Sequence, residues 1–272
     1  MAHYKQYFGM PRDPFNKDEL TPQDAFRSKD FREVTGGLND LLATKGIARI
    51  TAGSGEGKTY AVHAFADEVN RNRYTPAYVC LSTVSVPEFY KELIRVTGAE
   101  TKAGKSAMSA EVRQKISDEY AIHKRTFIII IDEAQLLSQY ILKELVLLTN
   151  FRYDSRYFFI LILVGTPLLC DTLSKGIHEP LRQRLTYKYQ FKGLDDDEVR
   201  AYVNHKLAIA NVSSDIVAED GMNALIGFCA GHGRSRVIDR IMSYALSLCA
   251  QVKAKEINAE IMVAAIAEYT TD

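Results

Sequence analysis

A glycine-rich segment holds residues of the types that bind phosphate. It reads Ala52-Gly53-Ser54-Gly55-Glu56-Gly57-Lys58-Thr59 and matches the Walker A pattern GxxxxGK[ST], except that alanine stands at the first glycine. Glycines allow a turn in which backbone N–H groups converge on phosphate oxygens, and the following helix adds the positive end of its dipole. The segment therefore predicts a phosphate-binding loop. A plain glycine turn between a strand and a helix is the alternative.

The residues that end this pattern predict a nucleotide with a metal ion. Lys58 would reach the β- and γ-phosphates, and the Thr59 hydroxyl would bind Mg²⁺. We therefore expect ATP and Mg²⁺ as the cofactors. The residues expected to bind the nucleotide are Gly53, Ser54, Gly55, Glu56, Gly57, Lys58, Thr59 and Tyr60.

Two carboxylates follow an apolar run, as in a Walker B motif. Residues 127–131 (FIIII) lead directly into Asp132 and Glu133. Asp132 would hold Mg²⁺ through water, and Glu133 would act as the general base for an attacking water. A helix N-cap is the alternative, since acidic residues suit a helix start. The preceding phosphate loop favours the catalytic interpretation, and the pair indicates ATP hydrolysis rather than transfer to a hydroxyl acceptor.

Thr166 is a candidate for contact with the γ-phosphate. It follows the apolar run 158–164 (FFILILV), whose tip would lie between the two Walker motifs. A turn threonine before Pro167 is the alternative, and Asn150 is a weaker candidate for the same role.

Three arginines are further candidates. Arg182 and Arg184 are two residues apart and so do not share a helix face. One could project to the γ-phosphate of a neighbouring subunit as an arginine finger while the other pairs locally; ordinary surface charge is the alternative. Arg236 begins an expected helix, where a cation opposes the dipole, so a nearby anion such as the nucleotide would compensate it.

The pattern of the first two thirds predicts the elements that carry these residues. Apolar runs alternate with helical patterns, which is typical of an α/β fold with a parallel sheet flanked by helices. We expect strands over 46–51, 77–82, 127–131, 158–164 and 186–191, helices over 58–70, 86–96, 110–124 and 142–150, and a loop over 100–109.

After Gly193 only helical patterns follow, over 195–206, 215–229, 235–250 and 259–269, with Asp195 as an N-cap. We therefore predict an N-terminal segment over 1–45, an α/β ATPase domain over 46–193 and a helical lid over 194–272. The last part carries a net charge of −5 and the rest +5.

Composition limits the class of protein. The 34 basic and 34 acidic residues exclude a polycation that coats nucleic acid, although a local basic patch remains possible. Four scattered cysteines without metal-ligand spacing are typical of a reducing compartment. No signal peptide is evident, and the run 158–164 is too short to cross a bilayer. We expect a cytoplasmic protein without a membrane partner.

These motifs together resemble the AAA+ ATPases, and more closely the ExeA/GspA-like branch that includes transposition regulators of the TniB and TnsC kind. The resemblance rests on Tyr7-Phe8-Gly9-Met10, Asp13-Pro14-Phe15, 53–59, 132–137, Asn150-Phe151, 164–167, 181–185 and 233–236. Thr166 and Ser235 depart from residues common in the branch. The resemblance implies a P-loop ATPase domain with a helical lid, nucleotide at subunit interfaces, hexameric or helical self-assembly, and a position near the adenine for Asp13-Pro14-Phe15.

The resemblance leads to two functional hypotheses. The first is an ATPase that assembles on duplex DNA without sequence preference and recruits or regulates a transposase in DNA transposition and recombination. The second is a secretion or assembly ATPase acting on protein partners; the absence of a membrane span and peptidoglycan-binding domain before Asp272 argues against it. A nucleotide switch with little turnover is a further alternative. For DNA we expect phosphate contacts from Lys102, Lys105 and Arg113. Arg71, Arg73 and Lys115 are further candidates, and a solvated charged face is the alternative for each residue.

Overall fold

The computed structural model describes residues 3–19, 21, 24–79, 85–149 and 157–271. The chain forms two compact units. One unit comprises residues 33–191, and the other comprises residues 1–32 together with 192–272. The first 32 residues thus belong to the unit of the C-terminal helices. The sequence alone instead predicts that residues 1–45 form a segment leading into the ATPase domain.

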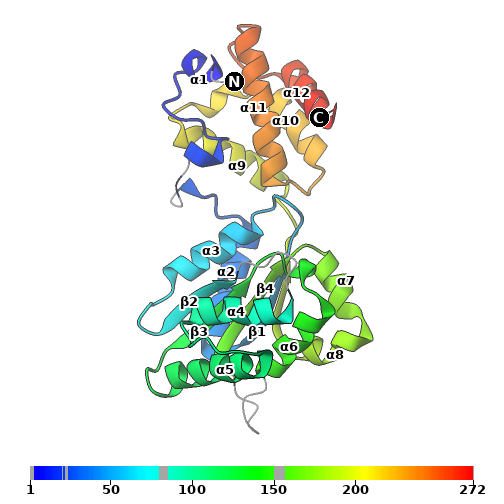
Figure 1. Ribbon diagram of the computed structural model, residues 1–272. Helices are drawn as coiled ribbons and strands as arrows, with labels where there is room; N and C mark the ends of the chain where they lie inside the picture. The colour runs from blue at the N-terminus through cyan, green and yellow to red at the C-terminus, as the bar shows by residue number, and fades with distance from the viewer. Residues whose placement is uncertain (1–2, 20, 22–23, 80–84, 150–156, 272) are drawn as a thin grey trace. The chain divides into compact units, whose positions relative to one another are not determined.

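A five-stranded parallel sheet forms the centre of the unit 33–191, in the order β2-β3-β4-β1-β5 (Figure 1). Strands β3 and β4 are buried along their whole length, as continuous apolar runs predict. In the edge strand β5, exposed residues alternate with buried or half-buried ones, because successive side chains point to opposite faces of the sheet. The strands are β1 (Gly46–Thr51), β2 (Tyr74–Val79), β3 (Thr126–Ile131), β4 (Phe159–Gly165) and β5 (Leu185–Gln190).

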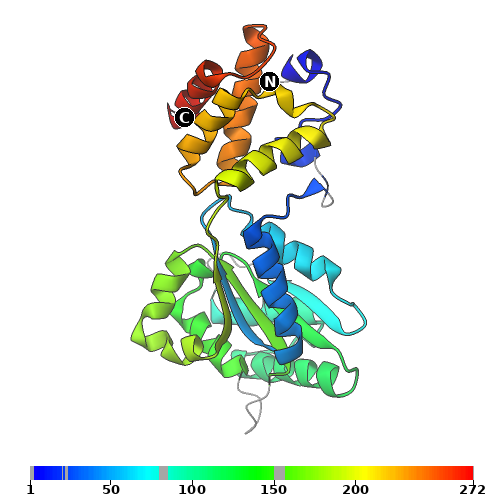
Figure 2. The same cartoon turned by 180° about the vertical axis from the view of Figure 1, so that it is seen from behind.

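Helices cover both faces of this sheet. Helices α4 and α5 lie in front of it in Figure 1, and α2 crosses the opposite face in Figure 2. The helices are α2 (Lys29–Thr44, whose first residues belong to the other unit), α3 (Lys58–Glu68), α4 (Val86–Thr97), α5 (Lys105–Ala121), α6 (Gln139–Thr149), α7 (Leu168–Ser174) and α8 (Glu179–Gln183), with the 3-10 turns η3 (Ala134–Leu136) and η4 (Gly176–His178).

The sequence-based interpretation of 100–109 as a loop holds for 100–104 and is wrong for 105–109. Helix α5 begins at Lys105, after Gly104 with a φ of 83°. Met108 of this segment is buried in the core, and Lys105 forms an ion pair with Glu144 of α6. These long-range contacts stabilise a helical start whose local sequence is polar. Part of the predicted strand 77–82 lies outside the described residues; β2 itself begins three residues earlier, at Tyr74.

Four longer helices build the other unit. They are α9 (Asp196–Ile209), α10 (Glu219–Cys229), α11 (Ser235–Gln251) and α12 (Ala259–Thr271), preceded along the chain by α1 (His3–Tyr7) and η1 (Lys17–Glu19) and joined by η5 (Ser214–Ile216). Asp195 caps α9 as predicted, in a capping box with Glu198. Within the described ranges, no helix is long and apolar enough to span a bilayer.

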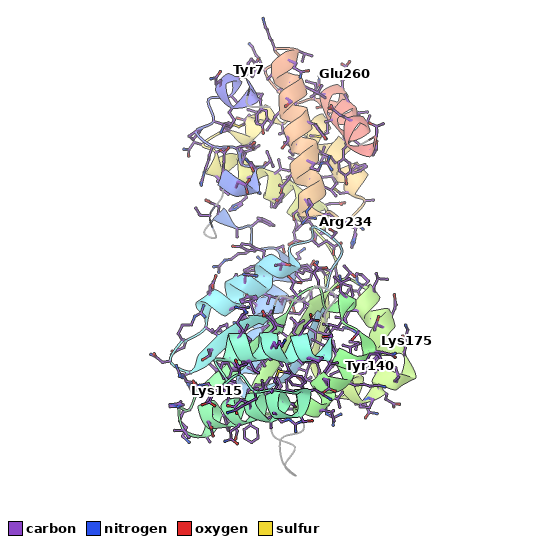
Figure 3. The ribbon with its side chains drawn as sticks, in the orientation of Figure 1. Tyr7, Lys115, Tyr140, Lys175, Arg234 and Glu260 are labelled. Atoms are coloured by element: carbon purple, nitrogen blue, oxygen red, sulfur yellow. The ribbon has the colours of Figure 1, made fainter. Side chains whose placement is uncertain are left out.

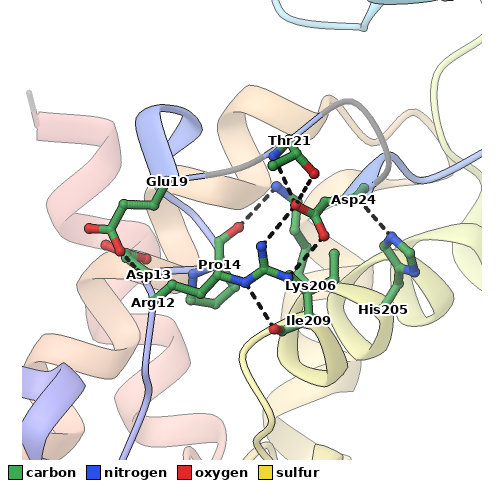
Figure 4. Close-up of polar contacts among 9 residues, drawn as sticks. All are labelled: Arg12, Asp13, Pro14, Glu19, Thr21, Asp24, His205, Lys206 and Ile209. Atoms are coloured by element: carbon green, nitrogen blue, oxygen red, sulfur yellow. Dashed lines mark hydrogen bonds and ion pairs between the residues drawn. The ribbon is translucent and has the colours of Figure 1, made fainter.

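The N-terminal segment is attached to α9 by buried polar contacts (Figure 4). Arg12 forms a two-pronged ion pair with Asp24, at 2.9 Å for each bond. Its Nε also donates to the carbonyl of Ile209, at 3.1 Å. Lys206 of α9 donates to the carbonyl of Pro14 at 3.0 Å. Phe15, Tyr4 and Met10 add apolar side chains to the core of this unit.

We expect Lys206→Met to destabilise this unit by about 2 kcal/mol. The buried Lys206 ammonium lies 3.6 Å from the buried carboxylate of Asp239, so the substitution removes a cation from that charge and a donor from the Pro14 carbonyl. The hydroxyl of Tyr202, which donates to Asp239 at 2.7 Å, limits the cost. Urea unfolding of the variant would measure the change. Lys253→Met, at an exposed lysine, is the control; equal midpoints for both would contradict the prediction.

Candidate active site

The loop after β1 has the backbone conformation of a phosphate-binding loop. Gly55 and Gly57 adopt left-handed conformations, with φ of 82° and 93°, which side chains disfavour. Gly57 is the N-cap of α3, so the helix begins at Lys58 without a side-chain cap. The N–H of Gly53 is already bonded to an anion, because it donates to the Glu56 carboxylate at 2.7 Å. The loop therefore presents N–H donors to negative charge.

The predicted Walker residues come together at the carboxyl ends of neighbouring strands. The Thr59 hydroxyl donates to Oδ2 of Asp132 at 2.8 Å. The Lys58 ammonium, whose side chain is 9% exposed, lies 3.6 Å from Oε1 of Glu133. Strand order explains this, since β4 lies between β1 and β3, and the loops after all three open at one edge of a parallel sheet. Hydroxyl and carboxylate oxygens are ligands that Mg²⁺ prefers, so Thr59 and Asp132 fit that ion.

Glu133 is held in a strained position. Its φ of 51° and ψ of 37° are left-handed, which costs a non-glycine residue about 1–2 kcal/mol. Its Oε2 accepts a hydrogen bond from Nε2 of Gln135 at 2.6 Å, while Oε1 faces Lys58. Both carboxylate oxygens are thus engaged by the chain itself.

Gln135 also connects Glu133 to the tip of β4, a role that sequence reasoning missed. Its Oε1 accepts the N–H of Thr166 at 3.0 Å. A Cβ at Gly165 would lie 2.6 Å from that oxygen, so only glycine permits the contact. The signal available in the sequence was a glutamine two residues after Glu133, but its partner depends on the adjacency of β3 and β4.

Thr166 has a buried hydroxyl without a hydrogen-bond partner. A buried polar atom of this kind costs free energy unless a ligand satisfies it. It stands on the strand between the two that carry the Walker residues, next to the loop, where the N–H of Ala52 donates to the carbonyl of Gly165 at 3.1 Å. This fits a contact with a nucleotide phosphate or its water. Asn150 lies outside the described residues.

The three predicted arginines occupy different places. Arg182 donates to the carbonyls of Ser174 and Leu173 at the end of α7, at 2.7 and 3.4 Å. Arg184 donates to the carbonyl of Pro180 at 2.7 Å. Arg236 is exposed in the first turn of α11, two residues after Arg234 (labelled in Figure 3), and belongs to the unit of C-terminal helices.

The residues expected to contact DNA make local interactions. Lys102 pairs with Glu100 at 2.6 Å, and Arg113 donates to the Ser109 hydroxyl at 3.1 Å. Lys105 is bonded to Glu144 at 2.6 Å. Glu144 also accepts the Tyr90 hydroxyl at 2.9 Å. Burial raises the pKa of that phenol to about 12; the hydrogen bond to Glu144 and its charge add to this effect, and a hydrogen bond with Ser109 opposes it. The Lys105–Glu144 pair thus links the start of α5 to α6.

Comparisons with known proteins agree with this geometry. Residues 41–173 match the family model described as an AAA domain. General secretion pathway protein A of Aeromonas hydrophila is 26% identical over 266 residues, which cover 96% of this chain and 48% of that protein. The chain therefore spans about half the length of this curated relative.

Solved structures share the fold. The ORC2 protein of Aeropyrum pernix, in ADPNP-ADP complexes, superposes with a TM-score of 0.64 at 15% identity and covers 95% of this chain and 71% of that one. Drosophila ORC bound to DNA gives a TM-score of 0.66 at 14% identity, with coverages of 99% and 66%. The predicted fold class is confirmed: a parallel sheet flanked by helices, with a C-terminal helical region, in the AAA+ P-loop NTPase fold.

Proposed function

We propose that this AAA+ fold binds ATP with Mg²⁺ and hydrolyses the nucleotide to ADP and phosphate. One observation carries the proposal: Lys58 and Thr59 of the glycine loop meet Glu133 and Asp132 at the edge of one parallel sheet. ATP-dependent phosphate release by the purified protein tests it. Absence of both ATP binding and phosphate release would overturn it.

Each residue has a role in this proposal. The loop N–H groups and Lys58 bind the phosphates, and Thr59 and Asp132 hold Mg²⁺. When bound, that ion neutralises charge on the phosphate oxygens. Glu133 accepts a proton from the attacking water once phosphate attracts Lys58 away from its Oε1. Gln135 keeps the carboxylate oriented through its bond to Oε2.

We expect the Thr166 hydroxyl to contribute to ATP turnover but not to the stability of the fold. Thr166→Val removes a hydroxyl that has no partner, so the free energy of unfolding should stay within about 1 kcal/mol of the original or rise. Loss of a contact made to the reacting phosphate should lower kcat by about 10- to 100-fold. Thermal melting and steady-state phosphate release check the two parts, with Thr166→Ser as the conservative control. Unchanged turnover in Thr166→Val would contradict the role.

Self-assembly and two partner classes belong to this proposal as well. We infer ATP-dependent assembly into a hexamer or helical filament, with Arg182 or Arg184 completing a neighbour's site. A protein partner is favoured by the 26% identity to a protein named for a general secretion pathway. Duplex DNA with a transposase is favoured by the excess of basic residues over 1–193 and by the fold shared with an ORC structure bound to DNA. Electron microscopy with ATP, with and without duplex DNA, distinguishes these two partner classes. Particles that assemble identically without DNA favour the protein partner.

A further inference from the structure

The amino ends of the strands surround a hollow at the edge of the sheet opposite to the Walker residues. It has a volume of about 550 Å³. Three cations and three aromatic rings line it: Lys45, Arg73, Lys124, Tyr74, Tyr120 and Phe158. Each cation stands close before a strand, and the described lining residues include no aspartate or glutamate. Because all the strands are parallel, their amino ends meet here as their carboxyl ends meet at the candidate active site.

The three cations of this hollow have no acidic partner in the described part of the chain. Among the described residues, no carboxylate lies within 4.0 Å of Lys45, Arg73 or Lys124, whereas other cations such as Lys105 are paired. Lys45 donates to the Tyr120 hydroxyl at 3.0 Å, and its ammonium lies 4.2 Å from the ring centroid. Lys124 donates to the carbonyl of Ala121 at 2.7 Å. Positive charge is thus concentrated here without a counter-ion from the residues that the structure describes.

Two of the cations also occupy positions that suit glycine. Lys45 and Lys124 have φ of 57° and 56°, in the left-handed region, just after α2 and α5. Glycine is the usual residue where a helix ends in this conformation. A lysine at both positions is unfavourable for the backbone, and both line the same hollow.

We propose that this hollow binds the phosphodiester backbone of nucleic acid. The cations would contact phosphates, and the aromatic rings would pack against a sugar or base, a combination typical of nucleic-acid grooves. The proposal deepens the DNA-directed candidate function and rests on it. Of the residues expected from the sequence to contact DNA, Arg73 lines this hollow, whereas Lys102, Lys105 and Arg113 do not.

The decisive variant is Arg73→Gln with Lys124→Gly. The glycine suits the left-handed backbone and removes a charge, so loss of binding would not reflect loss of folding. The matched control is Lys253→Gly with Lys255→Gln, because Lys253 is an exposed lysine with the same φ of 56°. Both variants remove two positive charges from the chain.

Fluorescence anisotropy with one labelled oligonucleotide, as single strand and as duplex, measures binding from about 50 to 200 mM salt. We expect the hollow variant to bind about 10-fold more weakly at low salt than the control. The slope of log K against log salt should become shallower by about 1.8 for duplex or about 1.4 for single strand. A larger affinity for the single strand, lost about 10-fold in Phe158→Leu, identifies base stacking; an equal loss on both substrates identifies backbone contact alone.

Three outcomes overturn the proposal. If the hollow variant and the control bind equally, the contacts lie elsewhere while the DNA-directed function stands. If neither the original protein nor the variants bind nucleic acid, both fail, although ATP hydrolysis stands. If polyglutamate displaces the oligonucleotide and depends on the same residues equally, the ligand is an acidic protein segment. ATP turnover should be unchanged in the hollow variant, which lies at the opposite edge of the sheet.

Discussion

Glu133→Gln should lower the turnover number for ATP by about 10²- to 10⁴-fold, with ATP affinity nearly unchanged. The amide cannot accept the proton of the attacking water, but it has the shape of the original side chain and keeps an oxygen for the bond from Gln135. Single-turnover phosphate release measures the chemical step, and equilibrium titration with a fluorescent ATP analogue measures binding. The variant should accumulate in its ATP-bound state and remain assembled.

Two controls make this result specific. Glu56→Gln changes a carboxylate within the glycine loop that bonds to the N–H of Gly53, so it tests whether loss of any nearby charge has the same effect. A protein that completes its output cycle with Glu133→Gln would be a nucleotide switch, and the hydrolytic proposal would then be wrong. A loss of affinity equal to the loss of turnover would assign Glu133 to binding instead.

Lys58→Ala should weaken ATP binding by about 100-fold, as expected for loss of a charge-assisted bond worth about 1.5–3 kcal/mol. The free energy of unfolding should not fall in this variant. The Glu133 side chain is 48% exposed and remains hydrated when its partner is removed, and the truncation also takes a cation out of a buried position. Isothermal titration with ATP and Mg²⁺ measures the affinity, and thermal melting measures the stability.

Lys188→Ala, on the edge strand β5, is the matched control because its exposed lysine is outside the candidate site. ATP binding by Lys58→Ala at the original affinity would contradict the assignment of the phosphate loop. Lys58→Arg keeps the charge with a wider group. A partial recovery of affinity in that variant would show that charge at this position, rather than side-chain volume, decides binding.

The sheet could be predicted from the sequence because its signals are local. Buried central strands such as β3 and β4 are continuous apolar runs, and the glycine loop follows β1 directly. Helix α2 was not predicted, since Gly36 and Gly37 lie in its middle and glycine disfavours helix. The reason for Gly37 lies elsewhere in the chain: a Cβ there would be 2.2 Å from the ring of Tyr187 on β5.

The candidate site could be predicted only in part for the same reason. The spacing within 52–59 and the pair at 132–133 indicate their chemistry by themselves. Gln135 could not be identified, because its contact with Thr166 exists only once β3 and β4 are neighbours. The ion pair of Lys105 could not be predicted either, because its partner Glu144 lies in α6, far along the chain. The cations of the hollow likewise converge through strand order, not through spacing.

The discontinuous unit made of residues 1–32 and 192–272 has a consequence for synthesis on the ribosome. Its first part emerges early, but α9, to which Arg12 and Lys206 attach it, comes only after residues 33–191 have been translated. At about 5–20 residues per second this delay is roughly 10–30 s. During that time Tyr4, Met10 and Phe15 lack the core that buries them, while the intervening unit already has its complete sequence. The nascent N-terminus is therefore the part of this chain most in need of a chaperone.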